Sequence, residues 1–289
     1  MRKKKYAVFT MDVEAFSDTE CLRSAGIQPG VDLMDGFDEY IRIMDRHGIK
    51  NTLFTLGELA PRIADRLRQC VSNGHALALH GQSHDAPMTL SLEQFRERTR
   101  MAKKNLLELF GVDVVGFRAP CFSMDADRLD VLQELDFRYD SSYLDFSPAR
   151  HTVKLDMTGY ERLRRNIFRR DQFYEFGLSK GKILGNPFPV SGGGYVRLFP
   201  WAFMRHVLRQ YIRENDYYVF YLHPFELTRQ KVPHIKNLTR RDRYYIRRGI
   251  RTYGWRIEGL IRMLKRQGYE FVTFEQLVQI MGTEHPATN

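Results

Sequence analysis

Two acidic residues follow an apolar run near the start of the chain. Asp12 and Glu14 come at the end of the run from Tyr6 to Val13. Side chains alternate along a strand, so both carboxylates point the same way. Two carboxylates side by side repel each other unless a cation or a shared proton separates them. The pair therefore indicates a site for a cation or proton, against the alternative of a solvated strand end, which is common for one carboxylate and weaker for a pair after a buried apolar run.

Two histidines follow a later apolar run. His80 and His84 in the segment HGQSH converge on one cation if the loop between them turns helically. With Glu14 they give two imidazoles and one carboxylate and leave a position for water. That set suits catalytic zinc, and it also accommodates cobalt, nickel or iron. Paired surface histidines are frequent, so this interpretation depends on the acids as well. His75, which begins the same run, is interpreted as structural.

Two further polar clusters come after apolar runs. Arg118 begins the segment RAPC, where an arginine can orient a carboxylate and the turn can present backbone N–H groups. A surface arginine beside a turn is the alternative. Cys121 offers a nucleophile, but a metal site gives a simpler mechanism. His223 follows the run from Tyr217 to Leu222 and is a candidate general acid, with a core histidine as the competing interpretation.

Apolar runs and amphipathic segments alternate along most of the chain. The predicted strands are 6–13, 51–56, 75–79, 114–117, 137–139, 217–222 and 269–272. The predicted helices are 32–47, 61–71, 91–110, 126–135, 200–213 and 255–267, with a short one after the last strand. Such alternation predicts right-handed βαβ units and parallel strands. The count suits an α/β fold, a distorted (β/α)7-8 barrel, whose chemistry lies at the carboxyl ends of the strands.

Local signals fix some of these boundaries. Asp32 is predicted to cap its helix and Gly48 to end it, while Ser91 and Gln94 form a capping box in a helix that ends at Gly111. The stretch 145–195, basic and then Gly-rich, does not resolve into elements. No linker or repeat is visible, so we expect one domain over 1–289, with a core at about 5–228, a basic segment at 229–251 and a closing helix and strand at 252–280.

Charge and cysteine content restrict the partners. Lys and Arg outnumber Asp and Glu by 45 to 35, which favours an anionic partner. No nucleic-acid-binding motif appears, so nucleic acid is not expected. Three scattered cysteines, Cys21, Cys70 and Cys121, fit a reducing compartment. The basic N-terminus lacks the features of a signal peptide, and no apolar stretch has the length of a membrane span. We expect a cytoplasmic protein that can rest on the inner membrane face.

Taken in order, these clusters resemble the polysaccharide deacetylases of carbohydrate esterase family 4, the nodulation-protein-B-like fold. The matching stretches are FTMDVE (9–14), GHALALHGQSH (74–84), GFRAPCFS (116–123), RYDSS (138–142), YLHPFEL (221–227) and GYEFVTFEQL (268–277). The first motif looks like the branch with Asp-x-Asp or Asp-x-Glu. The resemblance implies metal-dependent hydrolysis of an N-acyl group, expected to be acetyl, on a sugar of a cell-surface polysaccharide or its lipid-linked precursor.

The resemblance also implies roles for the first two clusters. In that branch the first acid is the base and the second binds the metal. Asp12 is therefore the expected base, and the expected ligands of a divalent metal, zinc before cobalt, nickel or iron, are Glu14, His80 and His84.

The remaining roles follow from the same resemblance. Arg118 would hold Asp12, the N–H of Cys121 would line the oxyanion hole, and His223 would be the acid. Asp140 matches the family's fourth motif, whose aspartate tunes the acid or the arginine, although that motif's tryptophan is missing. SGGGY (191–195) looks like a substrate loop of the same branch, and the expected substrate contacts are Gly193, Gly194, Tyr195, Pro120 and Phe122.

Two other functions compete with deacetylation. One is hydrolysis of a small amide, by a deformylase of an amino-sugar lipid or a ureide amidohydrolase. The other is a non-catalytic module that binds a glycan or lipid, which is disfavoured because every expected catalytic side chain is present. The basic segment is interpreted either as a solvated helix face or as a contact for an anionic membrane or lipid-linked sugar diphosphate through Arg240, Arg241, Arg243, Arg247 and Arg248.

Overall fold

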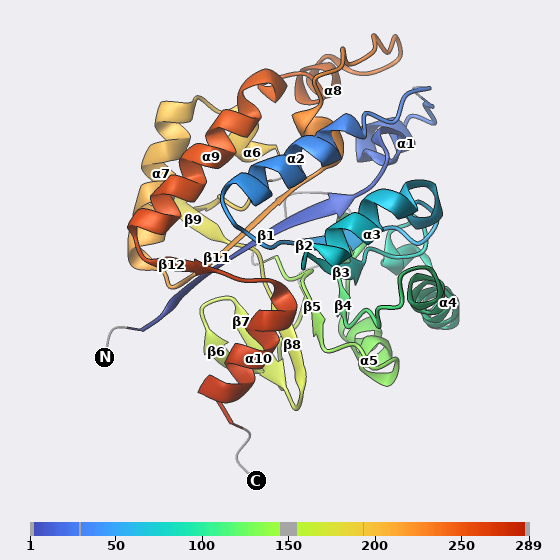
Figure 1. Ribbon diagram of the computed structural model, residues 1–289, viewed down its shortest axis with the longest axis vertical. Coiled ribbons are helices and arrows are strands. Elements are labelled where there is room, and N and C mark those ends of the chain that lie inside the picture. The colour runs from blue at the N-terminus through green and yellow to red at the C-terminus, as the bar shows by residue number, and fades with distance from the viewer. Residues whose placement is uncertain (1–2, 29, 145–154, 193, 287–289) are drawn as a thin grey trace. The chain divides into compact units, whose positions relative to one another are not determined.

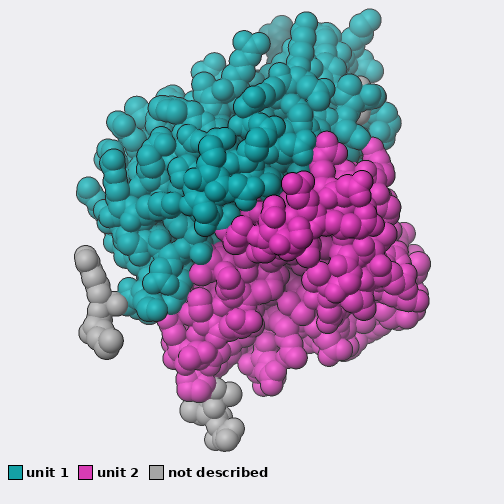
Figure 2. Space-filling model, viewed as in Figure 1, with its two compact units in different colours: residues 1–49, 179–271 teal, residues 50–178, 272–289 magenta. Residues whose placement is uncertain are grey.

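The computed structural model describes residues 3–28, 30–144, 155–192 and 194–286 (Figure 1). The chain forms two compact units, each built from two separate stretches (Figure 2). Residues 1–49 and 179–271 make unit 1, and residues 50–178 and 272–289 make unit 2. Because each unit is assembled from separate stretches of the chain, a linker between the units is not visible in the sequence. The expectation of a single domain stays a prediction. No helix of the described residues is both long and apolar enough to cross a membrane.

The strands of unit 1 are parallel. β1 (Lys5–Val13) pairs with β11 (Tyr217–Leu222) and with β12 (Tyr269–Phe271). The last residue pair along β1 and β11 is Met11 with Leu222, so Asp12 and His223 are the residues that come directly after this pair. Residues 6–13 of β1 are all buried, as expected of a parallel strand that is covered on both faces.

The helices of unit 1 follow the sequence prediction with two corrections. Of its longer helices, α2 (Asp35–Arg46) and α9 (Ile250–Arg266) lie in contact, and α7 (Trp201–Glu214) also packs on α9 (Figure 1). The predicted cap at Asp32 is wrong, because α2 begins at Asp35 and its N-cap is Met34. The start predicted for the helix at 255 is also wrong, because the left-handed Gly249 lets α9 begin at Ile250. The short helices are α1 (Glu20–Arg23), α6 (Tyr195–Leu198) and α8 (Arg240–Tyr245), with 3-10 turns η1 (Phe16–Asp18) and η5 (Pro224–Leu227).

In unit 2, a run of parallel strands continues into antiparallel ones. The order β2, β3, β4, β5 and β8 is parallel throughout, and β7 and β6 then add antiparallel. Their bounds are Thr52–Thr55, Ala76–Leu79, Gly116–Phe117, Tyr139–Asp140, Phe173–Phe176, Ile167–Arg170 and Glu161–Arg164. The strands β6 to β8, and the hairpin of β9 (Lys180–Ile183) and β10 (Asn186–Pro189) in unit 1, fall in the stretch that the sequence did not resolve.

The helices of unit 2 carry clear local signals. α4 (Leu92–Phe110) has the predicted capping box between Ser91 and Gln94, and it ends at Gly111 with φ +66°. The segment predicted as one helix from Pro61 is a 3-10 turn, η2 (Ala60–Ile63), followed by α3 (Ala64–Ser72). The other elements are the 3-10 turns η3 (Pro87–Thr89) and η4 (Pro120–Phe122) and the helices α5 (Ala126–Glu134) and α10 (Phe274–Glu284). Parallel strands alternating with helices confirm the predicted α/β class.

Candidate active site

The acidic pair lies at the carboxyl end of β1. Asp12 and Glu14 are buried, with 2% and 3% of their surfaces exposed. His223, which follows β11, places its Nε2 3.8 Å from Glu14 Oε1. The alternation along β1 and the pairing with β11 thus bring two acids and a histidine to one strand end.

His223 is held on its other side by a residue three positions later. Its Nδ1 lies 2.9 Å from Glu226 Oε1, and its backbone N–H donates to the same oxygen at 3.3 Å. Burial by itself lowers the pKa of His223, but the carboxylates of Glu14 and Glu226 outweigh burial and raise the pKa to about 9. The imidazole therefore holds a proton readily, as a general acid must.

The two predicted histidine ligands follow β3 in a tight loop. His80 and His84 are buried, and their ring centroids are 5.7 Å apart. Gly81 between them has φ +91°, which lets the loop reverse. His80 Nδ1 lies 2.8 Å from the carbonyl oxygen of Arg118. Because a carbonyl only accepts, Nδ1 carries the proton and Nε2 keeps the lone pair that a metal requires.

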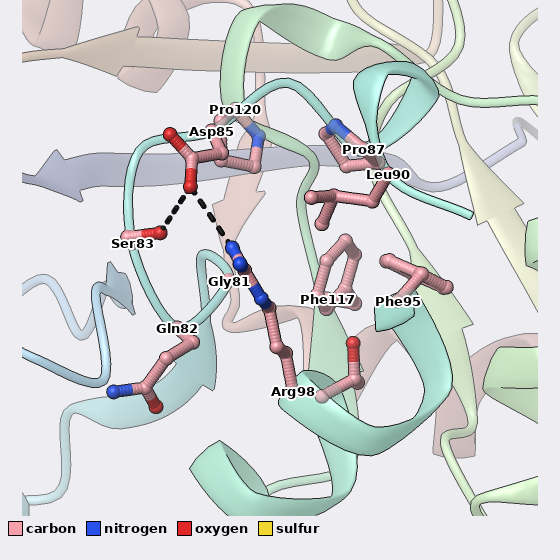
Figure 3. Close-up of a pocket in the computed structure, with 11 residues that line it drawn as sticks. Gly81, Gln82, Ser83, Asp85, Pro87, Leu90, Phe95, Arg98, Phe117 and Pro120 are labelled. Carbon is pink, nitrogen blue, oxygen red and sulfur yellow. Dashed lines mark hydrogen bonds and ion pairs between the residues drawn. The ribbon is translucent and has the colours of Figure 1, made fainter. Parts of the chain in front are cut away.

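The loop is braced beyond the histidines (Figure 3). Ser83 Oγ donates to Asp85 Oδ2 at 2.8 Å, and Arg98 Nη1 donates to the same oxygen at 3.0 Å. A cavity of about 20 Å³ beside this loop, lined by Gly81, Phe117, Pro120 and others, has room for about one water molecule. It is too small for a sugar, so we interpret it as a packing feature beside the histidines.

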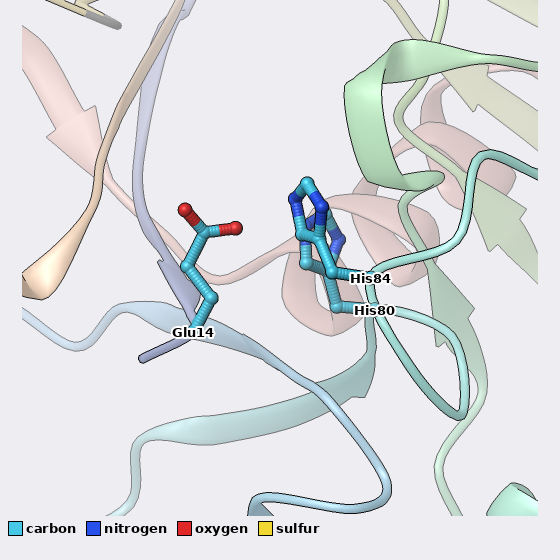
Figure 4. A group of neighbouring side chains, drawn as sticks. All are labelled: Glu14, His80 and His84. Atoms are coloured by element: carbon cyan, nitrogen blue, oxygen red, sulfur yellow. The ribbon is translucent and has the colours of Figure 1, made fainter. Parts of the chain in front are cut away.

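Glu14, His80 and His84 form a group of three potential metal ligands (Figure 4). One ligand atom of each lies within 4.8 Å of the others, and all three residues are buried. Two imidazoles and one carboxylate match the donor set of catalytic zinc sites, in which a fourth position takes water or substrate. The tautomer fixed at His80 suits the same use, so the residues fit a divalent metal.

Arg118 is a buried arginine rather than the surface arginine of the alternative interpretation. Its side chain is fully buried and lies over the ring of Phe54, 4.1 Å from the ring centroid. Nε donates to the carbonyl oxygen of Ser141 at 3.1 Å, and Nη2 donates to Ser141 Oγ at 3.0 Å. Ser141, the first serine of the RYDSS motif, therefore fixes the plane of the guanidinium.

The turn after Arg118 has an unusual backbone. Cys121 and Phe122 have φ of +55° and +53°, a region that side chains other than glycine rarely adopt. Such strain persists where the surroundings enforce it, often at active sites. The N–H of Ala119 donates to Ser142 Oγ at 2.9 Å, and that hydroxyl donates to Asp140 Oδ1 at 2.9 Å. Asp140 thus braces the turn that carries the expected oxyanion donor.

Asp140 also lies beside a carboxylate that the sequence prediction missed. Glu175 Oε1 accepts hydrogen bonds from the N–H groups of Ser142 and Tyr143 at 3.0 and 2.8 Å. Burial raises the pKa of Asp140 to about 6, although hydrogen bonds from Glu175 and Ser142 act against it. Burial and the charge of Asp140 raise the pKa of Glu175 well above its usual value. Glu175 lies on β8, in the stretch whose strands could not be assigned, so nothing in the sequence indicated this pair.

The glycine-rich segment lies beside β11. Gly192 forms a parallel bridge with Tyr221, and a Cβ on this glycine would stand 2.0 Å from the carbonyl oxygen of Tyr221. Gly194 is the N-cap of α6 with φ +89°, and Tyr195 begins that helix. Gly193 lies outside the described residues. Pro120 and Phe122 are on the strained turn, and no observation tests their predicted contact with substrate, nor that of Gly194 and Tyr195.

Arg197 of α6 is the second residue that the sequence prediction missed. Its Nε donates to Glu226 Oε2 at 2.8 Å, and both side chains are fully buried. Burial alone would raise the pKa of Glu226, but Arg197 and His223 lower the pKa below its usual value. Glu226 carried a weak signal, three residues after His223 in LHPFE. Arg197 carried none, since it is one arginine in a basic chain.

Comparisons with known proteins find similarity over two stretches of the chain. Residues 30–139 match the family model of polysaccharide deacetylases, and residues 147–279 match the model described as a domain of unknown function (DUF3473). The peptidoglycan deacetylase-like protein FGM2 of Gibberella zeae is 32% identical over 121 residues. That match covers 41% of this chain and 35% of the relative, so the chain spans about a third of the relative's length.

Solved structures agree on the fold over the whole chain. A crystal structure from Mycobacterium smegmatis that is assigned as a polysaccharide deacetylase has a TM-score of 0.64 at 18% identity, covering 100% of this chain and 95% of that one. The Puue allantoinase has a TM-score of 0.63 at 15% identity, covering 100% and 94%. These likenesses confirm the predicted barrel-type α/β fold.

Residues 30–139 thus match a polysaccharide deacetylase domain, which supports the resemblance to carbohydrate esterase family 4 that the motifs predicted. The assignment to the branch with an Asp-x-Glu first motif stays a prediction. Because an allantoinase shares this fold, the fold by itself does not identify a substrate.

Proposed function

We propose that this protein is a divalent-metal-dependent hydrolase that removes the N-acetyl group from sugar residues of a glycan. The observation that carries the proposal is the buried group of Glu14, His80 and His84, with the tautomer of His80 fixed by the carbonyl of Arg118. Similarity to a peptidoglycan deacetylase-like protein supports the choice of an acetylated glycan as substrate.

The metal would be held by Glu14, His80 and His84, with zinc the expected ion and cobalt, nickel or iron as alternatives. A divalent ion there would supply Lewis acidity, lowering the pKa of water and polarising the acyl carbonyl. Asp12 accepts the proton of the attacking water as the general base. Its neighbour Glu14 is committed to the ion, which explains how two buried carboxylates share one strand end.

The other groups act on the oxyanion and the leaving amine. The backbone N–H of Cys121 stabilises the developing oxyanion, and the strained turn aims it. Arg118 orients Asp12. His223 gives its proton to the departing amine, so the C–N bond breaks to leave acetate and a free amino sugar. The tuning role predicted for Asp140 stays a prediction; its contacts support the turn instead.

A finer substrate proposal concerns where the glycan is met. The formal charge of +10 and the exposed arginines at 240, 241, 247 and 248 suit an anionic lipid-linked sugar at the inner membrane face. This supports a cytoplasmic enzyme that acts on a precursor of a cell-surface polysaccharide. The alternative is an enzyme that acts on a small soluble amide.

Metal content and acetate release test the proposal together. The purified protein is depleted with chelator, reloaded with zinc, cobalt or nickel, and assayed on N-acetylated oligosaccharides, peptidoglycan, a lipid-linked N-acetyl sugar and small amides including allantoin. We expect acetate release from a glycan and its loss in His84→Ala together with most of the metal. The control is His206→Ala, which removes an exposed histidine of α7 and should change neither. Full metal occupancy in His84→Ala, or hydrolysis of small amides alone, would overturn the proposal.

A further inference from the structure

The strand end that carries His223 also carries a chain of three buried groups. His223 Nδ1 contacts Glu226 Oε1 at 2.9 Å, and Glu226 Oε2 accepts from Arg197 Nε at 2.8 Å. Each carboxylate oxygen of Glu226 therefore has its own charged or ionisable partner. An ion pair without solvent exposure is retained only when its geometry is good, because both charges have lost their hydration.

Arg197 is held in turn by the corner between α8 and α9. Its Nη1 donates to the carbonyl oxygen of Tyr245 at 2.8 Å and also to that of Arg248. Its guanidinium lies over the ring of Tyr245, 5.3 Å from the centroid. Gly249 completes the corner, and a Cβ there would stand 2.3 Å from the carbonyl oxygen of Arg197. The basic segment thus contacts the buried Arg197 through two backbone carbonyls and the ring of Tyr245.

That corner is anchored by apolar packing. Val232, Ile235, Leu238, Ile246 and Ile250 are buried in one cluster with Phe225, which lies between His223 and Glu226 in the sequence. The basic segment is therefore more than a solvated helix face. Its apolar side chains pack in the same cluster as Phe225, two residues after His223.

The glycine-rich segment explains how Arg197 reaches this place. Gly192 pairs with Tyr221 of β11, two residues before His223, and only a glycine fits against that carbonyl. α6 begins three residues after Gly192, at Tyr195, and Arg197 lies on its single turn. The approach of the backbone at Gly192 therefore brings the arginine alongside the end of β11.

We propose that Glu226 and Arg197 are positioning residues for His223, and that α6 and the corner between α8 and α9 hold Arg197 in place for this role. Glu226 accepts a hydrogen bond from the Nδ1–H of His223. The other ring nitrogen, Nε2, is therefore the one that presents a proton to the leaving amine. Arg197 holds Glu226 ionised and fixed in direction. The inference rests on the proposed role of His223 as acid. It also gives a function to the part of the chain that matches only a domain of unknown function.

The inference predicts a selective loss. A mispositioned acid slows cleavage of an amide, whose amine must be protonated to leave, but hardly affects 4-nitrophenyl acetate, whose phenolate leaves without a proton. In Glu226→Gln we expect kcat on an N-acetylated oligosaccharide to fall about 100-fold, with KM within about threefold and the ester rate within about fivefold of the wild type. Glu226→Asp should recover part of the amide rate. Equal losses on both substrates, with metal retained, would overturn the inference.

A spectroscopic measurement decides the same point without turnover. In Glu226→Gln the new side-chain amide must direct its oxygen to the fixed donor Arg197, so its N–H₂ group faces Nδ1 of His223. In ¹⁵N-histidine NMR spectra we expect the wild-type Nδ1–H signal of His223 to be lost in this variant. An unchanged Nδ1–H signal would overturn the positioning role. If the wild type hydrolyses neither substrate but the signal behaves as expected, the proposed function fails and the contact stands.

Controls separate positioning from damage to the fold. Arg197→Lys keeps the charge but loses the forked contacts, and the amide rate should again fall more than the ester rate. Arg197→Met combined with Glu226→Gln removes both charges, should fold, and should stay slow on the amide. Arg128→Lys removes another buried arginine, which donates to the carbonyl of Pro87 at 3.0 Å, and it should leave the ratio of amide to ester rates unchanged. A similar change of ratio in Arg128→Lys would count against the inference.

Discussion

At the end of β11 the carboxylate of Glu226 is buried beside a cation, whereas at β5 and β8 the carboxylates of Asp140 and Glu175 are buried beside each other. Arg197 lowers the pKa of Glu226 despite its burial. Burial raises the pKa of Asp140 and of Glu175, and the two carboxylates repel, so we expect this pair to share a proton. Glu175 Oε2, which accepts no hydrogen bond among the described residues, is the oxygen that such a proton would serve.

The difference shows what each cluster is suited to do. A cation keeps Glu226 ionised at any pH near neutral, so it can hold His223 in one orientation. A shared proton leaves Asp140 and Glu175 able to accept backbone N–H and hydroxyl donors, which is enough to brace the turn at Ala119. Asp12 and Glu14 form a third pair, for which we propose a metal ion as the separating charge.

The largest effect is expected from this third pair. Glu14→Gln should lose most of the bound metal and the activity with it. Asp12→Asn should keep the metal and lower kcat by about 10²–10⁴, the scale of general-base removal. Metal analysis and kinetics check both, with the exposed carboxylate variant Glu20→Gln as the control. If Asp12→Asn loses the metal and Glu14→Gln keeps it, the two roles are exchanged.

The second largest effect is expected from removing the cation of Arg197 beside Glu226. Arg197→Met leaves a buried carboxylate without its partner, and we expect the free energy of unfolding to fall by about 3–5 kcal/mol. Adding Glu226→Gln removes the stranded charge and should restore most of that loss. Denaturant unfolding measures both variants. Arg46→Met, which breaks the partly exposed pair with Glu258, should cost less than about 1 kcal/mol. A double variant as unstable as Arg197→Met would show that packing, and not charge, is what Arg197 supplies.

The shared proton predicts a smaller effect that depends on pH. The folded pKa of Asp140 is raised from 3.8 to about 6, so the stability from this pair is present below about pH 4 and is lost as pH rises through 6. In Glu175→Gln the amide N–H₂ replaces the shared proton. We expect unfolding free energies equal to the wild type near pH 4 and about 1–3 kcal/mol higher at pH 8. A difference that does not vary with pH would argue against proton sharing.

The smallest effect on the fold should come from the arginines of the basic segment, of which Arg243 is half-buried and the others are exposed. Replacing Arg240, Arg241, Arg243, Arg247 and Arg248 with glutamine should change stability little. At low salt it should weaken sedimentation with anionic liposomes, since each engaged cation contributes roughly 1 kcal/mol. High salt should weaken wild-type binding as well. The matched control replaces Arg62, Arg66, Arg68, Arg100 and Lys104, which are also exposed. If the wild type ignores the liposomes, or both sets act alike, the membrane contact is wrong.

Local patterns were enough to predict much of this protein. The runs that became β1, β3 and β11 were visible as apolar segments, and the polar residues at their ends gave the candidate ligands and acid, while the role of Asp12 as base came from the family resemblance. The caps of α4 were visible because Ser91, Gln94 and Gly111 act within one turn of chain. These features depend on residues that are close in the sequence, so they can be predicted from the sequence alone.

The start of α2 and the strands of 161–189 could not be predicted for different reasons. Asp32 is a favourable cap, but α2 begins at Asp35, whose carboxylate accepts hydrogen bonds from the distant Thr228 hydroxyl and Arg229 N–H. The strands β6, β7, β9 and β10 are short, and several of their residues are exposed or half-buried, so they lack the continuous apolar pattern of the parallel strands.

The partners of the buried charges were decided by tertiary structure alone. Arg197 reaches Glu226 across 29 positions and the carbonyls of Tyr245 and Arg248 across 48 and 51. Asp140 meets Glu175 only because β5 pairs with β8. A charge must find compensation once it is buried, but the sequence does not say which distant cation or proton will provide it, because that depends on which strands and helices the folded chain brings together.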